Sequence, residues 1–467
     1  MTVSAKKLVV VSNRGPASLI EAPDGTLEVR PGAGGLAPSL ARALQGADAL
    51  WVAAAMNDAE RRAAREGIPA QVAKGIDLHL VDLERPVMDG AYRVIANATL
   101  WFVLHGLFDR SRRPILDRHW HEAFEQYREY NRRFAEAVAA GAAEGATVVV
   151  NDYHLFLSGR YLASARPDLS SVHFTHTPFP APEELAVLPR AIATELVEGL
   201  AAFGACGFHT ERWAAQFRRC AAALDVDPPP VFVAALGTDA EALRREALRP
   251  EVEASKTALE QRVGDRRLLL RSDRVELSKN ILRGFLAFEE LLAVEPTWRG
   301  RVLFVAHTYP SRSDLPEYLA YQAEIEHLVE RINARFAGAE GPPIALEVED
   351  DFPASLAALS RYDVLLVNPI RDGMNLVAKE GPVLNERGGV LALSCEAGAF
   401  AELGRVALEV EPFDVSGTAK VLARALTLPA PERERRAHDL RALAAARPPA
   451  RWLEEVVHAA RPSRRRA

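Results

Sequence analysis

Cysteine is scarce in this chain, and its pattern argues against two ways of stabilising a fold or building a site. Only three cysteines occur among 467 residues, namely Cys206, Cys220 and Cys395, and none belongs to a CxxC pair. An odd number of widely spaced cysteines predicts neither a disulfide framework nor a zinc site. This usage is typical of a reducing compartment, so we expect the protein to be cytoplasmic.

Long apolar runs and a surplus of basic charge are also lacking. No apolar stretch reaches the ~20 residues that span a membrane, and the N-terminus shows no apolar core of a signal peptide. The formal net charge is −6, and we interpret the arginines at 464–466 as a solvated end. We therefore expect no nucleic-acid partner and no membrane, while the sequence leaves a homo-oligomer open.

The composition and the pattern that are present are those of an α/β protein. Hydrophobic residues make up 49% of the chain and charged residues 26%, as in folded globular proteins, and the length suggests two or three domains. Short apolar runs that end in polar turns and lead into helical patterns recur at 7–11, 146–150, 171–175, 268–270, 301–306, 364–367 and 390–394. This alternation of strands and helices predicts parallel sheets.

Other segments carry local signals of their own. Residues 18–30 place Asp24-Gly25 between alternating arms, which predicts a β-hairpin. One helical pattern starts at Leu36, and another covers 183–203 without a break. Residues 231–236 are typical of a strand.

Three consecutive prolines at 228–230 and the second strand–helix series from 268 divide the chain. We place the boundary near residue 240, with an N-terminal Rossmann-like domain at 1–240 and a second one at 241–430. A helical segment at 431–467 follows. The expected fold class is α/β, with two doubly wound domains.

The segment 368–380, NPIRDGMNLVAKE, is the most informative part of the chain. It follows a buried-strand pattern and runs into a helical one, so its turn should lie at the carboxyl edge of a parallel sheet, where open α/β folds bind ligands. Asp372, the flexible Gly373 and the N–H groups at the helix start suit a sugar hydroxyl or a phosphate. Glu380 could bind a polyol such as ribose. The alternative is an ordinary polar loop with a solvated carboxylate.

This segment resembles the nucleotide-sugar segment of the trehalose-6-phosphate synthases, glycosyltransferase family 20. The resemblance covers roughly residues 8 to 415. Its other motifs, in chain order, are Asn13-Arg14-Gly15-Pro16, Gly34-Gly35-Leu36, Tyr92 to Trp101, Asp152-Tyr153-His154-Leu155, His176-Thr177-Pro178-Phe179-Pro180, Gly207-Phe208-His209-Thr210, and Arg274 with Lys279. The family resemblance implies the GT-B architecture, in which two Rossmann-like domains face each other across a cleft and the C-terminal helical segment packs back toward the N-terminal domain.

The same resemblance implies a retaining glucosyltransferase. It would move glucose from UDP- or GDP-glucose to glucose 6-phosphate and form α,α-trehalose 6-phosphate, with small-molecule substrates and no metal or other cofactor. In the family, the equivalent of Asp372 meets the glucosyl hydroxyls and that of Glu380 the ribose. The implied donor-binding residues are Gly34, Gly35, His176, Arg274, Lys279, Asp372, Gly373, Met374, Asn375, Leu376, Val377 and Glu380.

Arg274 and Lys279 suit the chemistry of a leaving diphosphate. Its negative charge rises as the sugar–oxygen bond breaks, and cations placed beforehand stabilise that charge. An arginine offers a planar fork for phosphate oxygens and a lysine a compact charge. The alternative is surface salt bridging with the neighbouring Asp273 and Glu276. The family match in spacing and position favours the phosphate role.

The acceptor side rests on the resemblance as well. In the family, the equivalents of Arg14, Tyr92, Trp101 and Arg312 hold the phosphate and ring of glucose 6-phosphate, while Asp152 contacts the acceptor sugar. His176 would lie near the reacting carbon, so the expected catalytic residues are Asp152, His176, Arg274 and Lys279. The alternatives are a structural role for His176 and core positions for Tyr92 and Trp101. No metal site is predicted, because the pairs 119/121 and 173/176 diverge on a helix and on a strand.

The sequence departs from the family pattern in three places. The family usually has a second tryptophan and glycines where this chain reads Val52 to Met56. The usual Lys-Gly is Lys279-Asn280, and the usual Asp two residues after Arg274 is Glu276. Lys-Asn also occurs in a sister branch of pseudo-glycosyltransferases. These departures leave two alternatives open: the same donor with another phosphorylated acceptor, such as glycerol 3-phosphate or a cyclitol phosphate, or a catalytically silent paralogue that binds sugar phosphates.

Overall fold

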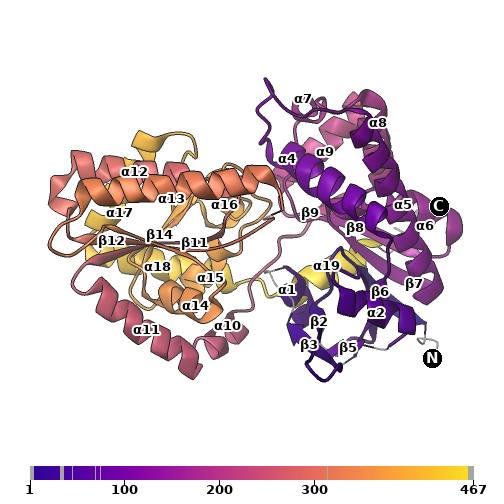
Figure 1. Cartoon of the computed structure of the whole chain (residues 1–467), viewed down its shortest axis with the longest axis horizontal. Coiled ribbons are helices and arrows are strands. Elements are labelled where there is room, and N and C mark those ends of the chain that lie inside the picture. The colour runs from indigo at the N-terminus through magenta and orange to yellow at the C-terminus, as the bar shows by residue number, and fades with distance from the viewer. Residues whose placement is uncertain are drawn as a thin grey trace. The chain divides into compact units, whose positions relative to one another are not determined.

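The computed structural model describes residues 5–31, 36–44, 46–68, 70–73, 75–312 and 314–460. The chain forms two compact units (Figure 1). The first runs to Leu236 and includes the C-terminal segment from Pro449, and the second consists of Gly237–Pro448. Each unit is an α/β sandwich with helices on both faces of a twisted sheet.

The first unit is built on a sheet with the strand order β10-β9-β8-β7-β1-β4-β6-β5. Its pairings are parallel except for that of β5 with β6. Its strands are β1 (Lys6–Val11), β4 (Ala49–Ala54), β5 (Ala70–Ala73), β6 (Ile76–Val81), β7 (Ala142–Asn151), β8 (Ser170–Thr175), β9 (Ala205–Phe208) and β10 (Val231–Val233). The predicted parallel sheet is therefore confirmed, with one antiparallel edge strand that the sequence pattern did not indicate.

Helices cover this sheet, and a hairpin follows its central strand. The hairpin, β2 (Ala17–Glu21) with β3 (Leu27–Pro31), confirms the prediction for 18–30, and Gly25 adopts the positive φ of 82° that such a turn favours. The helices are α1 (Leu36–Ala43), α2 (Asp58–Glu66), α3 (Arg85–Met88), the π-helical η1 (Asp89–Leu100), α4 (Trp101–His105), α5 (Arg118–Gly141), η2 (Tyr153–Leu155), α6 (Ser158–Ala165), α7 (Pro182–Leu185), α8 (Arg190–Ala201), α9 (Glu211–Ala223) and α19 (Pro449–Ala460).

The predicted single helix over 183–203 is wrong, because the segment folds as two helices. α7 ends at Leu185 and α8 begins at Arg190. Pro189 stands directly before α8 with an extended ψ of 137° and cannot donate the backbone hydrogen bond that a continuous helix requires. The apolar periodicity continues across this break, so it hides the interruption in the sequence.

The C-terminal segment divides between the two units. α18 (Ala430–Ala445) belongs to the second unit, whereas α19 belongs to the first. In the first unit the buried Trp452 of α19 packs edge-on against Phe174 of β8, with ring centroids 4.9 Å apart. The described part of the predicted C-terminal segment, up to Ala460, thus contains two helices that belong to different units.

The second unit has a wholly parallel sheet in the order β13-β12-β11-β14-β15-β16. Its strands are β11 (Arg267–Arg274), β12 (Val302–Tyr309), β13 (Ile344–Val348), β14 (Val364–Val367), β15 (Val390–Ser394) and β16 (Leu408–Val410). Its helices are α10 (Ala240–Glu246), α11 (Pro250–Val263), η3 (Leu277–Lys279), α12 (Ile281–Val294), η4 (Pro296–Trp298), α13 (Pro316–Phe336), α14 (Phe352–Arg361), α15 (Val377–Leu384), α16 (Phe400–Leu403), α17 (Val415–Thr427) and α18.

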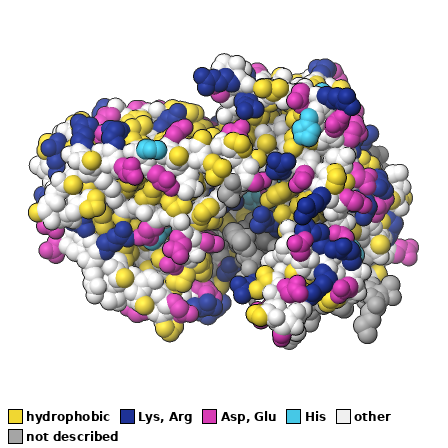
Figure 2. Space-filling view, viewed as in Figure 1, with side chains coloured by type: hydrophobic (Ala, Val, Ile, Leu, Met, Phe, Trp, Pro, Cys, Tyr) yellow, Lys and Arg dark blue, Asp and Glu magenta, His cyan; other side chains and the backbone are white. Residues whose placement is uncertain are grey.

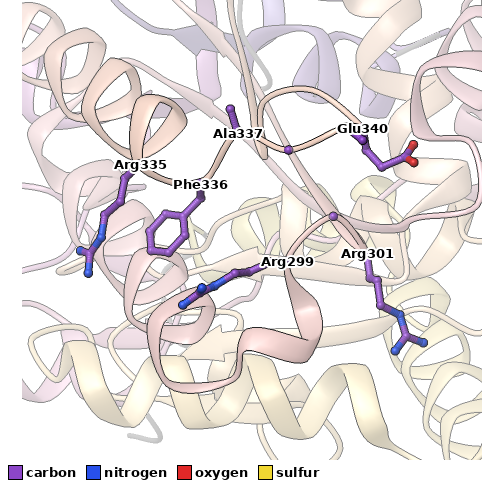
Figure 3. A pocket seen from close by; sticks show the side chains of 9 residues that line it. Arg299, Arg301, Arg335, Phe336, Ala337 and Glu340 are labelled. Atoms are coloured by element: carbon purple, nitrogen blue, oxygen red, sulfur yellow. The ribbon is translucent and has the colours of Figure 1, made fainter.

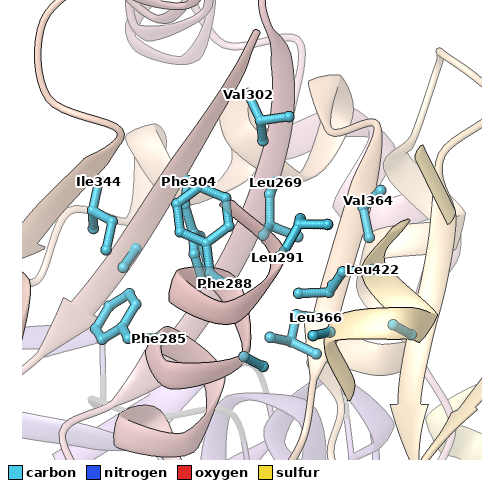
Figure 4. Close-up of a cluster of buried hydrophobic side chains, with 14 of the residues drawn as sticks. Leu269, Phe285, Phe288, Leu291, Val302, Phe304, Ile344, Val364, Leu366 and Leu422 are labelled. Carbon is cyan, nitrogen blue, oxygen red and sulfur yellow. The ribbon is translucent and has the colours of Figure 1, made fainter. Parts of the chain in front are cut away.

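A continuous apolar core holds α12 on this sheet (Figure 4). The rings of Phe285 and Phe288 on α12 meet Phe304 of β12 at centroid distances of 5.1 and 5.2 Å, and Leu422 of α17 joins them from the next helix. Each of these side chains is fully buried. Burying a side chain of this size stabilises a fold by about 1.5–3 kcal/mol, which fixes the strand ends that carry the polar loops.

The surface shows no concentration of one charge on the face in Figure 2, where basic and acidic side chains are interspersed over both units. Among the helices of the described part of the chain, none is both long and apolar enough to cross a membrane.

Candidate active site

The strand order gives each unit one topological switch point, where open α/β sheets bind ligands beyond the carboxyl ends of their strands. In the first unit it lies between β1 and β7, from which the sequence continues to Arg14 and Asp152. In the second unit it lies between β11 and β14, from which it continues to Lys279 and Asp372. Residues predicted to bind substrates therefore cluster at both switch points.

Asp152, directly after β7, has a strained backbone. Its φ of 71° and ψ of 170° lie in a region that is almost restricted to glycine. Hydrogen bonds hold it there: its N–H donates to Phe174 O at 2.9 Å, and its carboxylate accepts the N–H of His176 at 3.2 Å. Strain of about 1–3 kcal/mol persists where the surroundings enforce it, and such positions cluster at functional sites.

The predicted acceptor residues of the first unit lie in one polar and aromatic network. Arg14, which is exposed, donates to Tyr92 Oη at 3.1 Å, and the Tyr92 ring stacks on His154 at 5.7 Å. Tyr153 links this group to Trp101, with ring centroids 5.8 Å apart. Trp101 is only 7% exposed. The Trp101 ring therefore mainly packs against its neighbours, whereas the Arg14 guanidinium is exposed to solvent.

His176 forms part of a hydrogen-bonded chain inside the first unit. The N–H of Leu236 donates to His209 Nδ1, so His209 carries its proton on Nε2 and donates to His176 Nδ1 at 3.1 Å. His176 Nε2 then donates to Asn151 Oδ1 at 3.0 Å. Burial and the neighbouring His209 hold the pKa of His176 well below its ordinary value. The ring is neutral, with both nitrogens directed at protein partners.

In the second unit, Lys279 and Asp372 form a close ion pair across the switch point. Their Nζ and Oδ2 atoms are 2.7 Å apart, and the two side chains are 14% and 17% exposed. Burial lowers the pKa of Lys279, but the charges of Asp372 and Asp273 outweigh it and hold this pKa above its ordinary value. Lys279 is therefore cationic at neutral pH.

Glu276 connects the predicted donor cation Arg274 with Arg312, which we had assigned to the acceptor. Its carboxylate is fully buried, lies 3.2 Å from Arg274 and also accepts from Arg312. Ser311 Oγ donates to the same carboxylate at 3.0 Å. Salt bridging by Arg274 is thus present; its partner Glu276 is fully buried, whereas the Arg274 side chain is 36% exposed. With Lys279 and Asp372, this group has three cations and two carboxylates, an excess that suits an anion.

The segment after Asp372 places backbone groups and side chains at the start of α15. Asn375 has a positive φ of 74°, and its Nδ2 lies 3.2 Å from Asp372 Oδ2. α15 starts at Val377 with Leu376 as its N-cap, as the sequence predicted, and Glu380 lies half-buried in its first turn. Gly373 and Met374 are buried beside the loop at 397–399. The predicted Gly34 and Gly35 lie outside the described residues.

Four of the residues that complete these networks were not singled out from the sequence as site residues. They are Asn151, His209, Glu276 and Asn368. His209 stood in a motif and Glu276 beside Arg274, so the sequence held a signal for both. Asn368 opens the segment 368–380, which the sequence singled out. Nothing in the local pattern marks Asn151, because its partners come from distant segments.

A shallow pocket of about 580 Å³ lies elsewhere in the second unit (Figure 3). It is lined by Arg299 and Arg335, which stack against the Phe336 ring at 5.3 and 4.9 Å, and by Arg301, which points away from that ring. It contains no predicted site residue. Across the described ranges, no group of three or more His, Cys, Asp or Glu side chains is arranged to hold a metal ion.

Two doubly wound units with polar residues at their switch points define a class of two-unit α/β enzyme fold. The chain matches glycosyltransferase family 20 over residues 6–461 and belongs to that family. It is 34% identical to the trehalose-6-phosphate synthase of Mycolicibacterium smegmatis, over 97% of this chain and 92% of that protein. It is 33% identical to the bifunctional trehalose-6-phosphate synthase/phosphatase of Thermoproteus tenax, over 97% of this chain but only 63% of that longer protein.

Solved structures confirm the GT-B fold class. An α,α-trehalose-phosphate synthase (UDP-forming) from Burkholderia vietnamiensis superimposes with a TM-score of 0.84 at 31% identity, over 98% of this chain and all of that one. The E. coli trehalose-6-phosphate enzyme bound with UDP-2-fluoro glucose gives 0.84 at 27%, over 97% and 99%. The Burkholderia xenovorans synthase in complex with glucose-6-phosphate gives 0.83 at 28%, over 98% and 100%.

Proposed function

We propose that the protein transfers glucose from a nucleoside-diphosphate glucose to glucose 6-phosphate and forms α,α-trehalose 6-phosphate with retained configuration. The observation that carries this proposal is the cationic group at the second switch point, where Lys279 pairs with Asp372 at 2.7 Å and Arg274 lies 3.2 Å from the buried Glu276. Family membership supports it, as do the UDP-2-fluoro glucose and glucose-6-phosphate bound to two similar structures.

Each unit would bind one substrate through the residues at its switch point. In the second unit, the cations would take the diphosphate, Asp372 the glucosyl hydroxyls and Glu380 the ribose, with backbone N–H groups from the start of α15. On the acceptor side, Arg14, with its exposed charge, would hold the phosphate and Asp152 would contact the sugar. We assign Tyr92 and Trp101 to the same acceptor role. Arg312, for which the family resemblance also implies an acceptor role, shares Glu276 with Arg274 in the second unit.

We propose transfer on one face of the donor sugar. A double displacement needs a carboxylate nucleophile beside the anomeric carbon, and Asp152 is already assigned to the acceptor. The leaving diphosphate oxygen would accept the proton of the attacking hydroxyl as the old sugar–oxygen bond breaks and the new one forms. Arg274 and Lys279 would stabilise the charge that develops on the diphosphate.

Replacing one cation tests the proposal directly. We expect Arg274→Ala and Lys279→Ala each to lower transfer by about a hundredfold or more, since removing one preplaced donor of this kind typically costs that much. The measurement is kcat/KM with UDP-glucose and GDP-glucose and glucose 6-phosphate as acceptor. Arg299→Ala, in the shallow pocket, is the matched control. Activity within about tenfold of the wild type in either site variant would contradict the proposal.

A second acceptor is a real alternative, because the altered segment lies beside Arg14. Val52 to Ala54 are buried in β4, and the N–H of Ala54 donates to Asn13 O at 3.1 Å. Changes in this strand therefore bear directly on the Arg14 loop. Incubating the protein with donor and a panel of sugar, glycerol and cyclitol phosphates, then weighing the products by mass spectrometry, separates the two. Reaction with another acceptor while glucose 6-phosphate fails would favour the alternative.

The compartment stays a prediction. The three cysteines are unpaired, and two of them are buried. We propose a cytoplasmic location, which fractionation of cells that express the tagged full chain would test.

A further inference from the structure

Asn280, the residue after Lys279, occupies a backbone position that glycine would fill at the lowest cost. Its φ of 58° and ψ of 40° are left-handed, and it joins η3 to α12. Asparagine tolerates this conformation better than most residues do, but glycine tolerates it best. The side chain is only 1% exposed. The backbone requirement alone therefore does not explain the buried amide.

The amide of Asn280 joins loops from three strand ends. Its Nδ2 donates to Asn368 O at 3.0 Å, after β14, and to Pro412 O at 2.6 Å, after β16. Asn368 returns the contact, because its own Nδ2 donates to Asn280 O at 3.2 Å. Both side chains are buried. We name this reciprocal pair, Asn280 with Asn368, the amide clasp.

The amide clasp lies beyond the point where the backbone hydrogen bonds of the sheet connect β11 to β14. β11 and β14 pair only at Leu269–Val364 and Leu270–Leu365, well before the loops that carry Lys279 and Asp372. Beyond the clasp, the N–H of Ile370 donates to Ser278 O at 2.8 Å. The clasp thus continues the connection between neighbouring strands out to the ion pair.

The peptide groups around Lys279 are fixed on both sides. The fully buried Arg271 donates from Nη2 to Lys279 O at 3.0 Å, and the next carbonyl, that of Asn280, is the one that Asn368 binds. A lysine side chain has a flexible four-carbon stem, and holding it in one geometry costs ~2 kcal/mol of side-chain conformational entropy. A fixed backbone at its base reduces the number of directions that Nζ can reach.

We propose that Asn280 and Asn368 are positioning residues that hold Lys279 in register with Asp372, and so place the lysine charge for the donor diphosphate. This inference rests on the proposed function, because it assigns to the clasp the task of orienting a diphosphate-binding lysine. It predicts that the asparagine at 280 has a role that a glycine cannot replace.

The discriminating variant is Asn280→Gly, measured on the full chain. If Asn280 served only the left-handed turn, glycine would be neutral or better. On the clasp proposal it removes the two buried hydrogen bonds of Nδ2, together with the one that Asn280 Oδ1 accepts from Arg283 at 2.9 Å. We expect kcat to fall about tenfold while the KM for the donor changes less than threefold. We expect Asn368→Ala to behave in the same way. Because the two residues act as one unit, the double variant should lose no more than about twofold beyond the worse single variant.

Asn333→Ala is the matched control. The side-chain amide of Asn333, on α13, also makes two hydrogen bonds to the backbone: its Nδ2 donates to Ile344 O and its Oδ1 accepts from Ile344 N. Ile344 is the first residue of β13, away from the predicted site residues. We expect it to lower the melting temperature and leave kcat unchanged. If Asn280→Gly does not fold, Asn368→Ala carries the same test through its lost donation to Asn280 O.

Calorimetry with UDP and GDP separates this inference from the proposed function. If Lys279→Ala binds both nucleotides as the wild type does, the proposed donor site is wrong. If Lys279→Ala loses binding while Asn280→Gly and Asn368→Ala keep wild-type kcat, the donor site stands and the amide clasp is overturned. Losses in the two single variants that multiply in the double variant would also contradict it.

Discussion

At the scale of the residue, the strained backbone of Asp152 makes an unusual prediction about stability. In an ordinary strand or loop, glycine is less stable than alanine by about 0.5–1 kcal/mol. At φ 71° and ψ 170° the order should reverse, so we expect Asp152→Gly to be more stable than Asp152→Ala by about 1 kcal/mol or more. Urea unfolding of both variants measures the difference.

Both variants remove the carboxylate that accepts the N–H of His176, so that loss cancels in the comparison. We expect both to lose transfer to the acceptor. An alanine variant as stable as the glycine variant would show that the backbone relaxes on substitution, and the strain would then depend on the aspartate side chain.

The residue scale also shows which part of the site the sequence could predict. Lys279 and Asp372 belong to contiguous motifs that follow predicted strands, and the structure brings them together. Glu276 lay within the same stretch, yet its burial and its contact with Arg312 depend on a loop about 36 residues away. The local sequence does not predict whether a carboxylate such as that of Glu276 will be buried, because its partners come from elsewhere in the chain.

At the scale of the element, strands were easier to predict than the exact run of helices. Uninterrupted valine and leucine runs marked β1, β11 and β14, since strands of a parallel sheet that is covered on both faces are rich in apolar residues. β5 (AQVA) and β16 (LEV) each contain a polar residue within three or four positions, so neither forms such a run. The helical periodicity over 183–203 hid the break at Pro189, where a missing N–H outweighs the apolar pattern.

The loop after β15 gives a prediction about the packing of elements. Gly398 N donates to Asp372 O at 3.0 Å, and a Cβ at Gly398 would lie 1.9 Å from Gly373 O. Gly398→Ala must therefore push the Asp372 loop away. We expect binding of UDP or GDP to weaken about tenfold or more and the protein to be destabilised by about 1–3 kcal/mol. Calorimetry and thermal melting measure these two effects.

Gly338→Ala is the control for this substitution. No atom lies within 4 Å of the Cβ that it would add, and its φ is not in the left-handed region. We expect nucleotide binding by this variant to equal that of the wild type. Normal binding by Gly398→Ala would mean that the loop at 372–374 shifts without consequence for the donor site.

At the scale of the whole molecule, both units have polar residues at the switch point of the sheet. The ionisable side chains buried nearby are either neutral or paired with an opposite charge. In the first unit the buried groups are histidines. His173 packs between Phe156 and Phe203 with ring centroids 5.4 and 5.2 Å away, and burial lowers its pKa to about 3. In the second unit the buried charges are paired, as Arg271 is with Asp273 at 2.9 Å. The two units should therefore respond differently to acid.

The histidines make the stability of the first unit depend on pH well before its carboxylates are protonated. Their folded pKa values lie below the ordinary 6.5, so the unfolded chain binds protons that the folded unit does not. The stabilisation is complete above about pH 7 and is lost as the pH falls below 6.5, at about 1.4 kcal/mol for each histidine between pH 7.5 and 5.5. Tryptophan fluorescence in urea measures it, because every tryptophan except Trp298 lies in the first unit.

His173→Gln should remove about half of this dependence, since it takes away one of the two titrating histidines. Glutamine does not titrate and keeps hydrogen-bonding atoms near Asp152 O and Thr175. His119→Gln, at an exposed position on α5, should leave the slope as in the wild type. The side chains that approach the two buried histidines are Thr175, Asn151, His209 and the rings of Phe156, Phe174, Phe203 and Trp452. Among the described residues, Asp152 brings a carboxylate to this pair, since its side chain accepts the N–H of His176. If His173→Gln kept the full slope, the proton uptake would belong to other groups, and the neutral histidine pair would not be what makes this unit sensitive to acid.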